Sequence, residues 1–551
     1  MMFDTQLFRV DHLSMFVAIF VMVFSALIIF YSFGFMKGKK GLLRYYIYIL
    51  LTMAASIGAV FSDNLVLFIV FWGFLGLLLY LLIGFGEKKS TAYTAKKTFI
   101  IIGGTDAFMI LGLGFLWHLA GTLQMNDLSV ALTSKTAIVA YLCLASGAFA
   151  KAGAMPFHTW VPDTAEDAPI PVAAYLPAAL DKLLGIYFLV RLTLDIFVMT
   201  KGMNIFLMAL GSFTIVAAVM MALVQHDLKR LLGYHAVSQV GYMILGIGTG
   251  NPVGIAGGLF HMLNNAIYKS GLFLSGGAVE KRTGTTDLSK LGGLAKVMPV
   301  TFGAFLIASL AISGVPPFNG FASKWMIYQG IINTAGGSKL WILWLVAAMF
   351  GSALTLASFM KLLHAIFLGQ PSAEMKDLVG ERKETGATMW IPSVILAALC
   401  VVFGVFAVAI PLKMLIFPSM GGIPGFTGIW DSGLATALIV IGIIIGFLIY
   451  LAGTAVRTRT TDIFIGGETV KQYPDMRVSG VEFYETIKDI GILRIIYRWA
   501  EKKFFDVYEV GVKFTLGFNR VLRFIHNGVL LTYLAWCLLG MGVLFFYLLR
   551  R

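Results

Sequence analysis

Two lysines lie close to prolines inside long apolar stretches of the chain. Lys151 comes shortly before Pro156, and Lys324 comes shortly after Pro316 and Pro317. Proline interrupts the hydrogen bonding of a helix, and a charge at the depth of a bilayer costs at least about 2.5 kcal/mol, so such a lysine is a candidate functional group. Interrupted helices in both halves of a chain are typical of ion paths in transporters. The lysine precedes the proline in the first stretch and follows it in the second, an order that we attribute to an inverted repeat.

Further ionisable residues fall inside the apolar stretches. His261, Asn265 and Lys269 are spaced by four residues, which places them on one face of a helix. Lysine suits proton transfer because desolvation favours its neutral form and a nearby carboxylate favours its charged form. A row of such groups, bridged by water, could pass protons along the membrane plane. The candidate ion-translocation residues are Asp106, Lys151, Lys182, His261, Lys269 and Lys324, and the accessory candidates are Asp181, Lys229, His235 and Asn265.

Some of these residues have a simpler interpretation. Lys182 and Lys269 could anchor helix ends by extending their amines to the interface. Lys229, with Arg230 beside it, fits better as a determinant of topology. For Lys151 and Lys324, beside the prolines, a functional role is the stronger hypothesis.

The composition is that of an integral membrane protein. Of 551 residues, 59% are hydrophobic and 13% are charged, and the mean hydropathy is +0.86. A soluble domain carries roughly 25% charged residues. The cysteines Cys143, Cys400 and Cys537 fall in apolar segments without metal-ligand spacing. Because no haem, iron–sulfur, zinc or nucleotide-binding signature is present, we expect no cofactor and no metal in this chain, and so no redox centre of its own.

Apolar stretches of about 20 residues, long enough to cross a bilayer, recur along the chain. The sequence predicts an all-α membrane protein with fourteen transmembrane helices near 13–36, 43–61, 64–86, 93–117, 136–157, 170–194, 203–224, 230–250, 254–279, 299–334, 340–368, 390–416, 433–453 and 529–549. The expected parts are N-terminal helices (1–92), the cores of two inverted repeats (93–194 and 203–368), accessory helices (390–453), a polar and amphipathic segment (454–528) and a C-terminal transmembrane helix (529–551).

The net charge of +14 could suggest a nucleic-acid partner, but the placement of the basic residues indicates membrane topology instead. Basic residues concentrate in alternate loops, as in 37–44, 88–97 and 281–296, while the intervening loops carry few. Basic loops stay in the cytoplasm, so we expect both termini on the non-cytoplasmic side, in a prokaryotic cytoplasmic membrane. We expect no nucleic-acid partner.

The segment 454–528 contains the one long polar region between predicted spans. From Val481 to His526 it alternates apolar and basic residues at helical spacing. This pattern predicts a lateral-type amphipathic helix at the cytoplasmic interface, although Gly491, Gly511 and Gly517 argue against one unbroken rod. A solvated linker is the alternative.

Several motifs resemble one known family. They are the run from Lys151 to Asp163 (KAGAMPFHTWVPD) with Ala168-Pro-Ile-Pro171, the run Asp227 to Tyr234, the segment His261 to Lys269, and Gly314-Val-Pro-Pro-Phe318. Together they resemble the antiporter-like subunits (types L, M and N) of respiratory complex I, of Mrp-type sodium/proton antiporters and of the membrane arms of energy-converting hydrogenases. The resemblance covers roughly residues 11–370.

The resemblance implies a role for each matching residue. Lys151 matches the lysine of the family's first broken helix, which exchanges protons with a nearby carboxylate. Lys182 matches the lysine of the next helix, and His261 and Lys269 match the central relay. Lys324 matches the terminal lysine, which opens toward the far side of the membrane.

The sequence departs from the family pattern in three ways. The family's glutamate after a Phe-Trp pair is replaced by Gly73, and Asp106 is the expected replacement partner of Lys151. Asn265 stands where a second histidine is common. The first span aligns with the family's third helix, so that two leading helices are missing from the match.

The leading hypothesis is a subunit that translocates a cation, a proton or possibly sodium, within a multisubunit redox-driven complex of the complex I or hydrogenase type. One alternative is an Mrp-type antiporter module without a redox partner. Another is a membrane scaffold that does not pump and supports a module such as a carbon-dioxide-hydrating enzyme. The expected partners are other membrane subunits, protons or sodium ions, and lipids.

Overall fold

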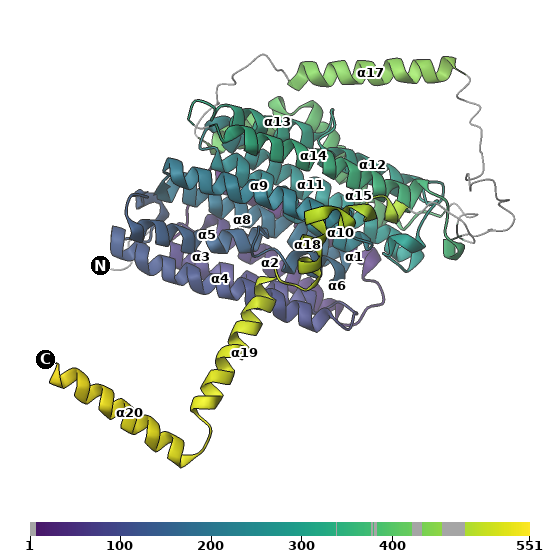
Figure 1. Cartoon of the computed structure of the whole chain (residues 1–551). Helices are drawn as coiled ribbons and strands as arrows, with labels where there is room; N and C mark the ends of the chain where they lie inside the picture. The colour runs from purple at the N-terminus through teal and green to yellow at the C-terminus, as the bar shows by residue number, and fades with distance from the viewer. Residues whose placement is uncertain are drawn as a thin grey trace. The chain divides into compact units, whose positions relative to one another are not determined.

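The structure is a computed structural model that describes residues 7–337, 339–375, 378, 383–420, 432–453 and 480–550. The chain divides into two compact units, residues 1–489 and 490–551. The described part is almost entirely helical, as the apolar periodicity predicts (Figure 1).

The first half of the larger unit contains α1 (His12–Phe35), α2 (Leu42–Phe61), α3 (Leu65–Ile83), α4 (Thr91–Ala120), α5 (Lys135–Ala152), α6 (Trp160–Asp167), α7 (Ile170–Tyr175), the π-helical turn η2 (Leu176–Leu180), α8 (Asp181–Val190) and a second π-helical turn, η3 (Arg191–Ile196). Two short strands, β1 (Val130–Ala131) and β2 (Phe197–Val198), pair in parallel.

The second half contains α9 (Lys201–Leu223), α10 (Leu228–Gly248), α11 (Pro252–Thr283), α12 (Pro299–Ser313), α13 (Asn319–Ile332), α14 (Trp341–Leu363), the π-helical turn η5 (His364–Leu368), α15 (Ala387–Val405), the π-helical segment η7 (Val408–Ile416), α16 (Phe417–Ser419) and α17 (Ser432–Ala452).

In the described residues, nine helices are long and apolar enough to cross a membrane. They are α1, α2, α3, α4, α7 to η3, α9, α14 with η5, α15 and α20 (Leu530–Leu549). The other expected spans coincide with helices that are shorter, such as α12, or that lie in the centre of the bundle and carry polar residues, such as α10 and α11.

Helix α11 forms the centre of the bundle. It packs against α7, η2 and α8 from the first half and against α10, α12, α13 and α15 from the second. Its residues from Val253 to Val279 are all buried. Polar side chains on α11 are therefore held away from lipid, and their hydrogen bonds must be made by protein groups or by water.

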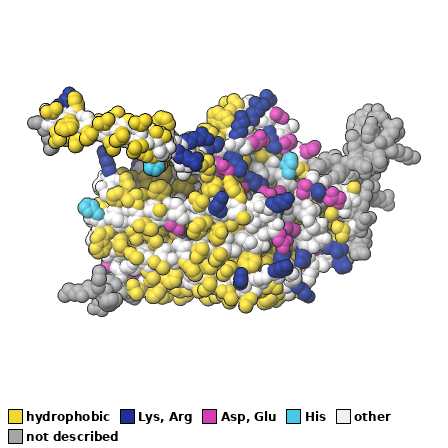
Figure 2. All heavy atoms as spheres, turned by 90° about the horizontal axis from the view of Figure 1, so that it is seen from below, with side chains coloured by type: hydrophobic (Ala, Val, Ile, Leu, Met, Phe, Trp, Pro, Cys, Tyr) yellow, Lys and Arg dark blue, Asp and Glu magenta, His cyan; other side chains and the backbone are white. Residues whose placement is uncertain are grey.

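The outer helices present apolar side chains, as a surface in contact with lipid requires. Helix α4, for example, exposes Phe99, Ile100, Phe108, Ile110 and Leu111. Figure 2 shows hydrophobic side chains covering much of one face of the bundle, with most of its Lys and Arg side chains toward one end. This segregation agrees with a protein that is integral to a membrane.

An ion-pair cluster holds the start of α1 against the end of α8. Asp11 caps α1 by accepting from the Ser14 N–H. Arg191 is buried and donates to Asp11 at 2.7 Å, to Asp195 at 2.6 Å and to the Tyr187 hydroxyl at 3.0 Å. Burial raises the pKa of Asp11, but the Arg191 charge and the Ser14 hydrogen bond outweigh it, so that the pKa lies below its usual value.

The second unit contains α18 (Gly491–Glu501), α19 (Val507–Ile525) and α20. Two helices thus stand where one amphipathic segment is expected, and residues 454–479 of that segment lie outside the described residues. The segment is not one unbroken rod, as expected: α18 begins at Gly491, and the two helices are separated near Lys503, which has a φ of 56°, whereas Gly511 and Gly517 lie within α19.

Candidate functional site

The segment between α5 and α6 has a defined turn at Gly153. Gly153 has a φ of 80°, a conformation that favours glycine. The Ala154 N–H donates to the Phe149 carbonyl at 2.8 Å, and the Gly153 N–H donates to Phe149 and Ala150. These bonds satisfy carbonyls at the end of α5, as in a Schellman motif. Pro156 follows and α6 begins only at Trp160.

The segment between α12 and α13 repeats this geometry. Gly314 has a φ of 81°, and the Val315 N–H donates to the Leu310 carbonyl at 3.1 Å. Pro317 stands at the same distance along the chain from Gly314 as Pro156 does from Gly153. The two interruptions are therefore locally equivalent and have the same chain sense.

This equivalence corrects one inference from the sequence. A rotation that relates two segments preserves the direction of the chain, so it cannot reverse the order of lysine and proline. Counted from Gly314, Ile312 occupies the position of Lys151. Lys151 and Lys324 are thus not equivalent residues of a repeat; they approach the two interruptions from opposite sides.

Two buried amines lie at the first interruption. The Lys151 amine donates to the Trp72 carbonyl at 3.0 Å and lies 4.3 Å from the centroid of the Trp72 ring. The Lys182 amine comes from α8, and a Cβ built at Gly153 would lie 3.0 Å from it. Lys182 is completely buried, and its amine has no hydrogen-bond partner among the described residues.

Two carboxylates exert their charge on Lys151: Asp106 on α4 and Asp181 on α8. Each has one buried oxygen that has no hydrogen-bond partner in the described part of the chain, Oδ1 in Asp106 and Oδ2 in Asp181. Buried polar groups of this kind commonly hold water. A Cβ at Gly73 would have no atom within 4 Å, so no side chain fills the position of the family's glutamate.

The π-helical turn η2 presents Asp181 and Lys182 to this site. Pro177 lies within η2 and lacks an N–H. Two side chains of α11 satisfy nearby carbonyls: the Asn265 amide donates to Ala178 at 3.2 Å, and the Ser270 hydroxyl donates to Ala174 at 2.9 Å. Asn265 therefore supports the backbone of the turn.

The buried histidines and Lys269 lie between the two interruptions. His261 contacts Ser323 Oγ at 2.9 Å and Gln239 Oε1 at 3.1 Å through its two ring nitrogens. His235 contacts Ser358 Oγ at 2.7 Å.

The Lys269 amine donates to the Leu232 carbonyl at 3.1 Å and lies over the Phe359 ring. Like Lys151, this buried amine is thus bonded to a backbone carbonyl, without an ion pair to a carboxylate among the described residues.

Lys324 lies at the second interruption. Its amine donates to the Ile312 carbonyl at 2.9 Å and lies 4.8 Å from the centroid of the Tyr242 ring. A Cβ at Gly314 would lie 3.0 Å from Lys324 Cδ. The amine is thus held against the last turn of α12.

These groups form an electrostatic sequence across the bundle. Beyond Lys151 and its carboxylates, the charge of Asp181 acts on the ionisation of Lys182, and the charge of Lys182 acts on that of Lys269. Lys269 and Lys324 both act on His235, and Lys324 acts on His261. Each of the six ion-translocation candidates therefore lies within electrostatic range of at least one other.

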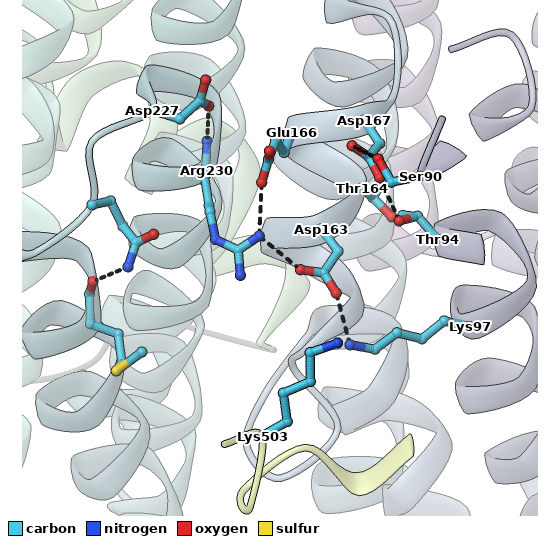
Figure 3. A network of polar contacts seen from close by, with 12 residues as sticks. Ser90, Thr94, Lys97, Asp163, Thr164, Glu166, Asp167, Asp227, Arg230 and Lys503 are labelled. Atoms are coloured by element: carbon cyan, nitrogen blue, oxygen red, sulfur yellow. Dashed lines mark hydrogen bonds and ion pairs between the residues drawn. The ribbon is translucent and has the colours of Figure 1, made fainter. Parts of the chain in front are cut away.

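A polar network lies at one end of α6, outside this sequence (Figure 3). Asp163 pairs with Lys97 at 2.7 Å and with Arg230 at 3.1 Å, and Arg230 also pairs with Glu166 at 2.8 Å. The buried Lys229 donates to the Ala168 carbonyl at 3.0 Å. Lys229 thus supports the junction of α6 and α7.

Glu166 lies outside the expected spans. Burial raises its pKa, but the hydrogen bond and charge of Arg230 and the charge of Lys88 outweigh burial. The pKa of Glu166 therefore lies below its usual value of 4.5, and the carboxylate stays ionised in mild acid.

The positions of two polar residues, Lys97 and Tyr242, could not be predicted from the sequence. Lys97 belongs to a basic run, typical of a solvated loop, but it is buried on α4. Tyr242 stands in an apolar run with no sign that it lies over Lys324. Among the described residues no group of three His, Cys, Asp or Glu side chains could hold a metal ion.

Comparison with known proteins identifies the family. The model of the NADH:quinone oxidoreductase/Mrp antiporter transmembrane region matches residues 62–355, and that of the N-terminus of complex I chain 5 matches residues 5–46. The chain belongs to the NADH:quinone oxidoreductase/Mrp antiporter family. The family prediction made from the motifs around Lys151 and Lys324 is confirmed.

Curated relatives of the antiporter family cover most of this chain. The A1 subunit of the Na(+)/H(+) antiporter of Staphylococcus haemolyticus is 35% identical over 78% of this chain and 55% of its own length. The corresponding Na(+)/H(+) antiporter protein of Alkalihalophilus pseudofirmus is 33% identical over 72% of this chain and 52% of its own length. The chain thus spans about half the length of these relatives.

Two solved structures have this antiporter-family fold. The archaeal membrane-bound sulfane sulfur reductase complex has a chain with a TM-score of 0.81 and 24% identity, over 99% of this chain and 89% of that one. The Mrp complex of Dietzia sp. DQ12-45-1b has a chain with a TM-score of 0.67 and 22% identity, over 75% and 84%. Each of these chains belongs to a complex.

Proposed function

We propose that this chain translocates a cation across a membrane as an antiporter-like subunit of a multisubunit complex. The observation that carries the proposal is the buried lysine at each interruption, together with the buried Lys182 and Lys269 on α8 and α11. An idle charge in a bilayer is costly, so a row of them requires a function.

The proposed path runs at mid-membrane from Asp106 and Lys151 through Lys182 and Lys269 to Lys324, with His235 and His261 beside it. Each amine responds to the charge of its neighbour, so protonation passes along as coupled titrations. Waters at the unpartnered oxygens of Asp106 and Asp181 would complete the path.

The proposed topology has fourteen spans with both termini on the non-cytoplasmic side. In it, the span near 136–157 is interrupted near Pro156 and the span near 299–334 is interrupted near Pro316 and Pro317, and both belong to inverted repeats with cores at 93–194 and 203–368. The basic residues near the start of α4 and of α10 then face the cytoplasm.

The complex that contains this chain is proposed to be redox-driven. The fold similarity to a respiratory membrane complex over 99% of this chain supports this choice. The antiporter names of the curated relatives favour an Mrp-type module instead. Purification of the native complex and identification of its subunits by mass spectrometry would distinguish the two, because only the first contains redox subunits.

The test of translocation uses the purified complex in proteoliposomes. Lys151→Ala and Lys324→Ala should each lower ion transport by about 100-fold, within the 10²–10⁴-fold range of positioned proton-transfer groups. Lys135→Ala, at an exposed position on the same helix as Lys151, is the matched control. Undiminished transport in both lysine variants, with the complex assembled, would reduce the chain to a scaffold.

A further inference from the structure

Helix α18 has an exposed apolar stripe. Four large apolar residues follow one another at intervals of one, three or four positions along one side of the helix, namely Ile492, Ile495, Ile496 and Trp499. These residues are between 43% and 76% exposed. Tyr497 lies on another face of α18 and is buried. The stripe is therefore a separate apolar face, which the described part of the chain leaves uncovered.

Aromatic rings extend this stripe beyond the end of α18. The positive φ of Lys503 turns the chain, and the Phe504 N–H donates to the Trp499 carbonyl at 3.0 Å. The centroid of the Trp499 ring lies 5.5 Å from that of Phe504 and 6.4 Å from that of Phe505. Both phenylalanines are exposed, as Trp499 is. Tryptophan is enriched at the boundary between membrane and water, and such rings bury a large apolar area when they enter a bilayer.

Basic residues flank the apolar stripe. Arg494, Arg498 and Lys502 follow one another at intervals of four residues, on the side of α18 next to Ile495. All three are exposed. The only acidic residue within the helix is Glu501. Long basic side chains can extend along an apolar surface and keep their charge at its polar boundary. One helix thus combines an uncovered apolar face with a row of cations beside it.

Helix α18 is too short to cross a bilayer. Its 11 residues extend about 16 Å at 1.5 Å per residue, about half the thickness of the hydrocarbon core. The chain connects it on both sides to helices that are long enough to cross. Before it, the Tyr484 hydroxyl donates to the Ala357 carbonyl on α14 at 3.2 Å, seven residues ahead of Gly491. After it, α19 is joined to α20 by residues 526–529 alone.

We propose that α18 and the turn after it bind the anionic phospholipid surface of the cytoplasmic leaflet. The apolar stripe and the aromatic rings enter the headgroup layer, while Arg494, Arg498 and Lys502 contact lipid phosphates. The row of cations favours a surface of phosphates over the apolar side of a neighbouring membrane helix as the occupant. The choice of leaflet follows from the proposed topology, in which the segment before α20 is cytoplasmic. This attachment goes beyond the proposed function, because it moves no ion.

The test measures hydrogen exchange of the amides of residues 491–505 in the purified complex. The complex is held in nanodiscs of phosphatidylcholine, either alone or mixed with phosphatidylglycerol. Exchange should be about ten-fold slower or more with the anionic lipid, because each basic residue near an anionic surface adds to the attraction. Salt at 1 M shortens the Debye length to about 3 Å and should remove most of this difference in the wild type.

The double variant Arg498→Gln with Lys502→Gln should also lose most of the difference between the two lipids. The matched control is Lys37→Gln with Lys40→Gln, which removes the same charge from two exposed residues between α1 and α2 and should keep the difference. Equally slow exchange in both lipids would overturn the proposal and indicate that a protein subunit covers the stripe. Equally fast exchange in both, or an unchanged difference in the double variant, would overturn it too. Exchange is measured without ion transport, so none of these outcomes bears on the proposed function.

Discussion

Moving the carboxylate that acts on Lys151 tests the role of Asp106. Gly73 and Gly76 lie three residues apart on one face of α3, and a Cβ at Gly76 would lie 3.9 Å from Asp106 Oδ2. A carboxylate introduced by Gly73→Glu would therefore lie within about one helical turn of the Asp106 carboxylate. It would also adjoin Trp72, whose carbonyl accepts from Lys151.

The expected magnitude follows from Coulomb's law. At a separation of about 6 Å and an effective dielectric constant of about 20, one carboxylate stabilises the lysine ammonium by about 3 kcal/mol. Asp106→Asn removes this stabilisation, so that transport should fall by up to about 100-fold if loading of Lys151 limits it. Gly73→Glu alone should change transport little, because two adjacent carboxylates do not both ionise readily.

The double variant Asp106→Asn with Gly73→Glu should recover most of the lost transport. The control is Asp106→Asn with Gly73→Gln, which has the same size without the charge. Transport by the two double variants is measured as proton uptake by proteoliposomes, normalised to the amount of assembled complex. Equal transport in the two double variants, or wild-type transport in Asp106→Asn, would refute the reasoning.

Three further predictions concern stability, read as thermal unfolding of the purified protein in detergent. Arg191→Met removes three hydrogen bonds, two to the partly exposed carboxylates of Asp11 and Asp195 and one to the buried Tyr187 hydroxyl, so it should cost about 2 kcal/mol; an unchanged unfolding temperature would contradict the ion-pair cluster. The folded pKa of Glu166 is below its unfolded value near 4.5, so its contribution to the free energy of unfolding is present above that pH and is lost as the pH falls through the folded pKa. Glu166→Gln should therefore flatten the curve of stability against pH between about pH 5 and 3. A curve identical to that of the wild type would argue against the Arg230 pair. Gly185→Ala should cost about 1–3 kcal/mol, because its Cβ would lie 2.6 Å from the Ala152 N and 2.9 Å from the Ala148 carbonyl oxygen. Gly103→Ala is the control and should cost nothing, because a Cβ there would have free space. Equal effects of the two substitutions would refute the close packing of α5 and α8.

The positions of helix ends and the partners of the lysines differ in how far the sequence indicates them. The sequence predicts breaks near Pro156 and near Pro316 and Pro317, and α5 ends at Ala152 and α12 at Ser313, a few residues before these prolines. What the amines contact could not be read from the sequence, because the contacts of Lys151 and Lys324 are backbone carbonyls, which every residue has. Only the tertiary arrangement, which brings Lys151 of α5 to the Trp72 carbonyl of α3 and Lys324 of α13 to the Ile312 carbonyl of α12, selects one.

Residues near the ends of spans were predicted least well. Lys97 stands in a basic run that indicates a solvated loop, yet it is buried because α4 begins at Thr91 and α6 brings Asp163 to it. Tyr242 gave no signal at all, since an aromatic residue in an apolar helix usually only fills space. Side chains that act through tertiary contacts leave no periodicity in the sequence.

The two helix ends at the interruptions have an electrical consequence. The aligned peptide dipoles of a helix give its C-terminus the equivalent of roughly half a negative charge. The Lys182 amine lies at the end of α5, and the Lys324 amine donates to a carbonyl in the last turn of α12. Each helix end therefore acts as a fixed partial counter-ion, worth up to about 2 kcal/mol when partly buried. Unlike a carboxylate, a peptide dipole cannot take up a proton, so its attraction for the amine persists through every cycle. This permanent bias offers a physical reason why a chain with glycine at position 73 can keep buried lysines without the family's glutamate.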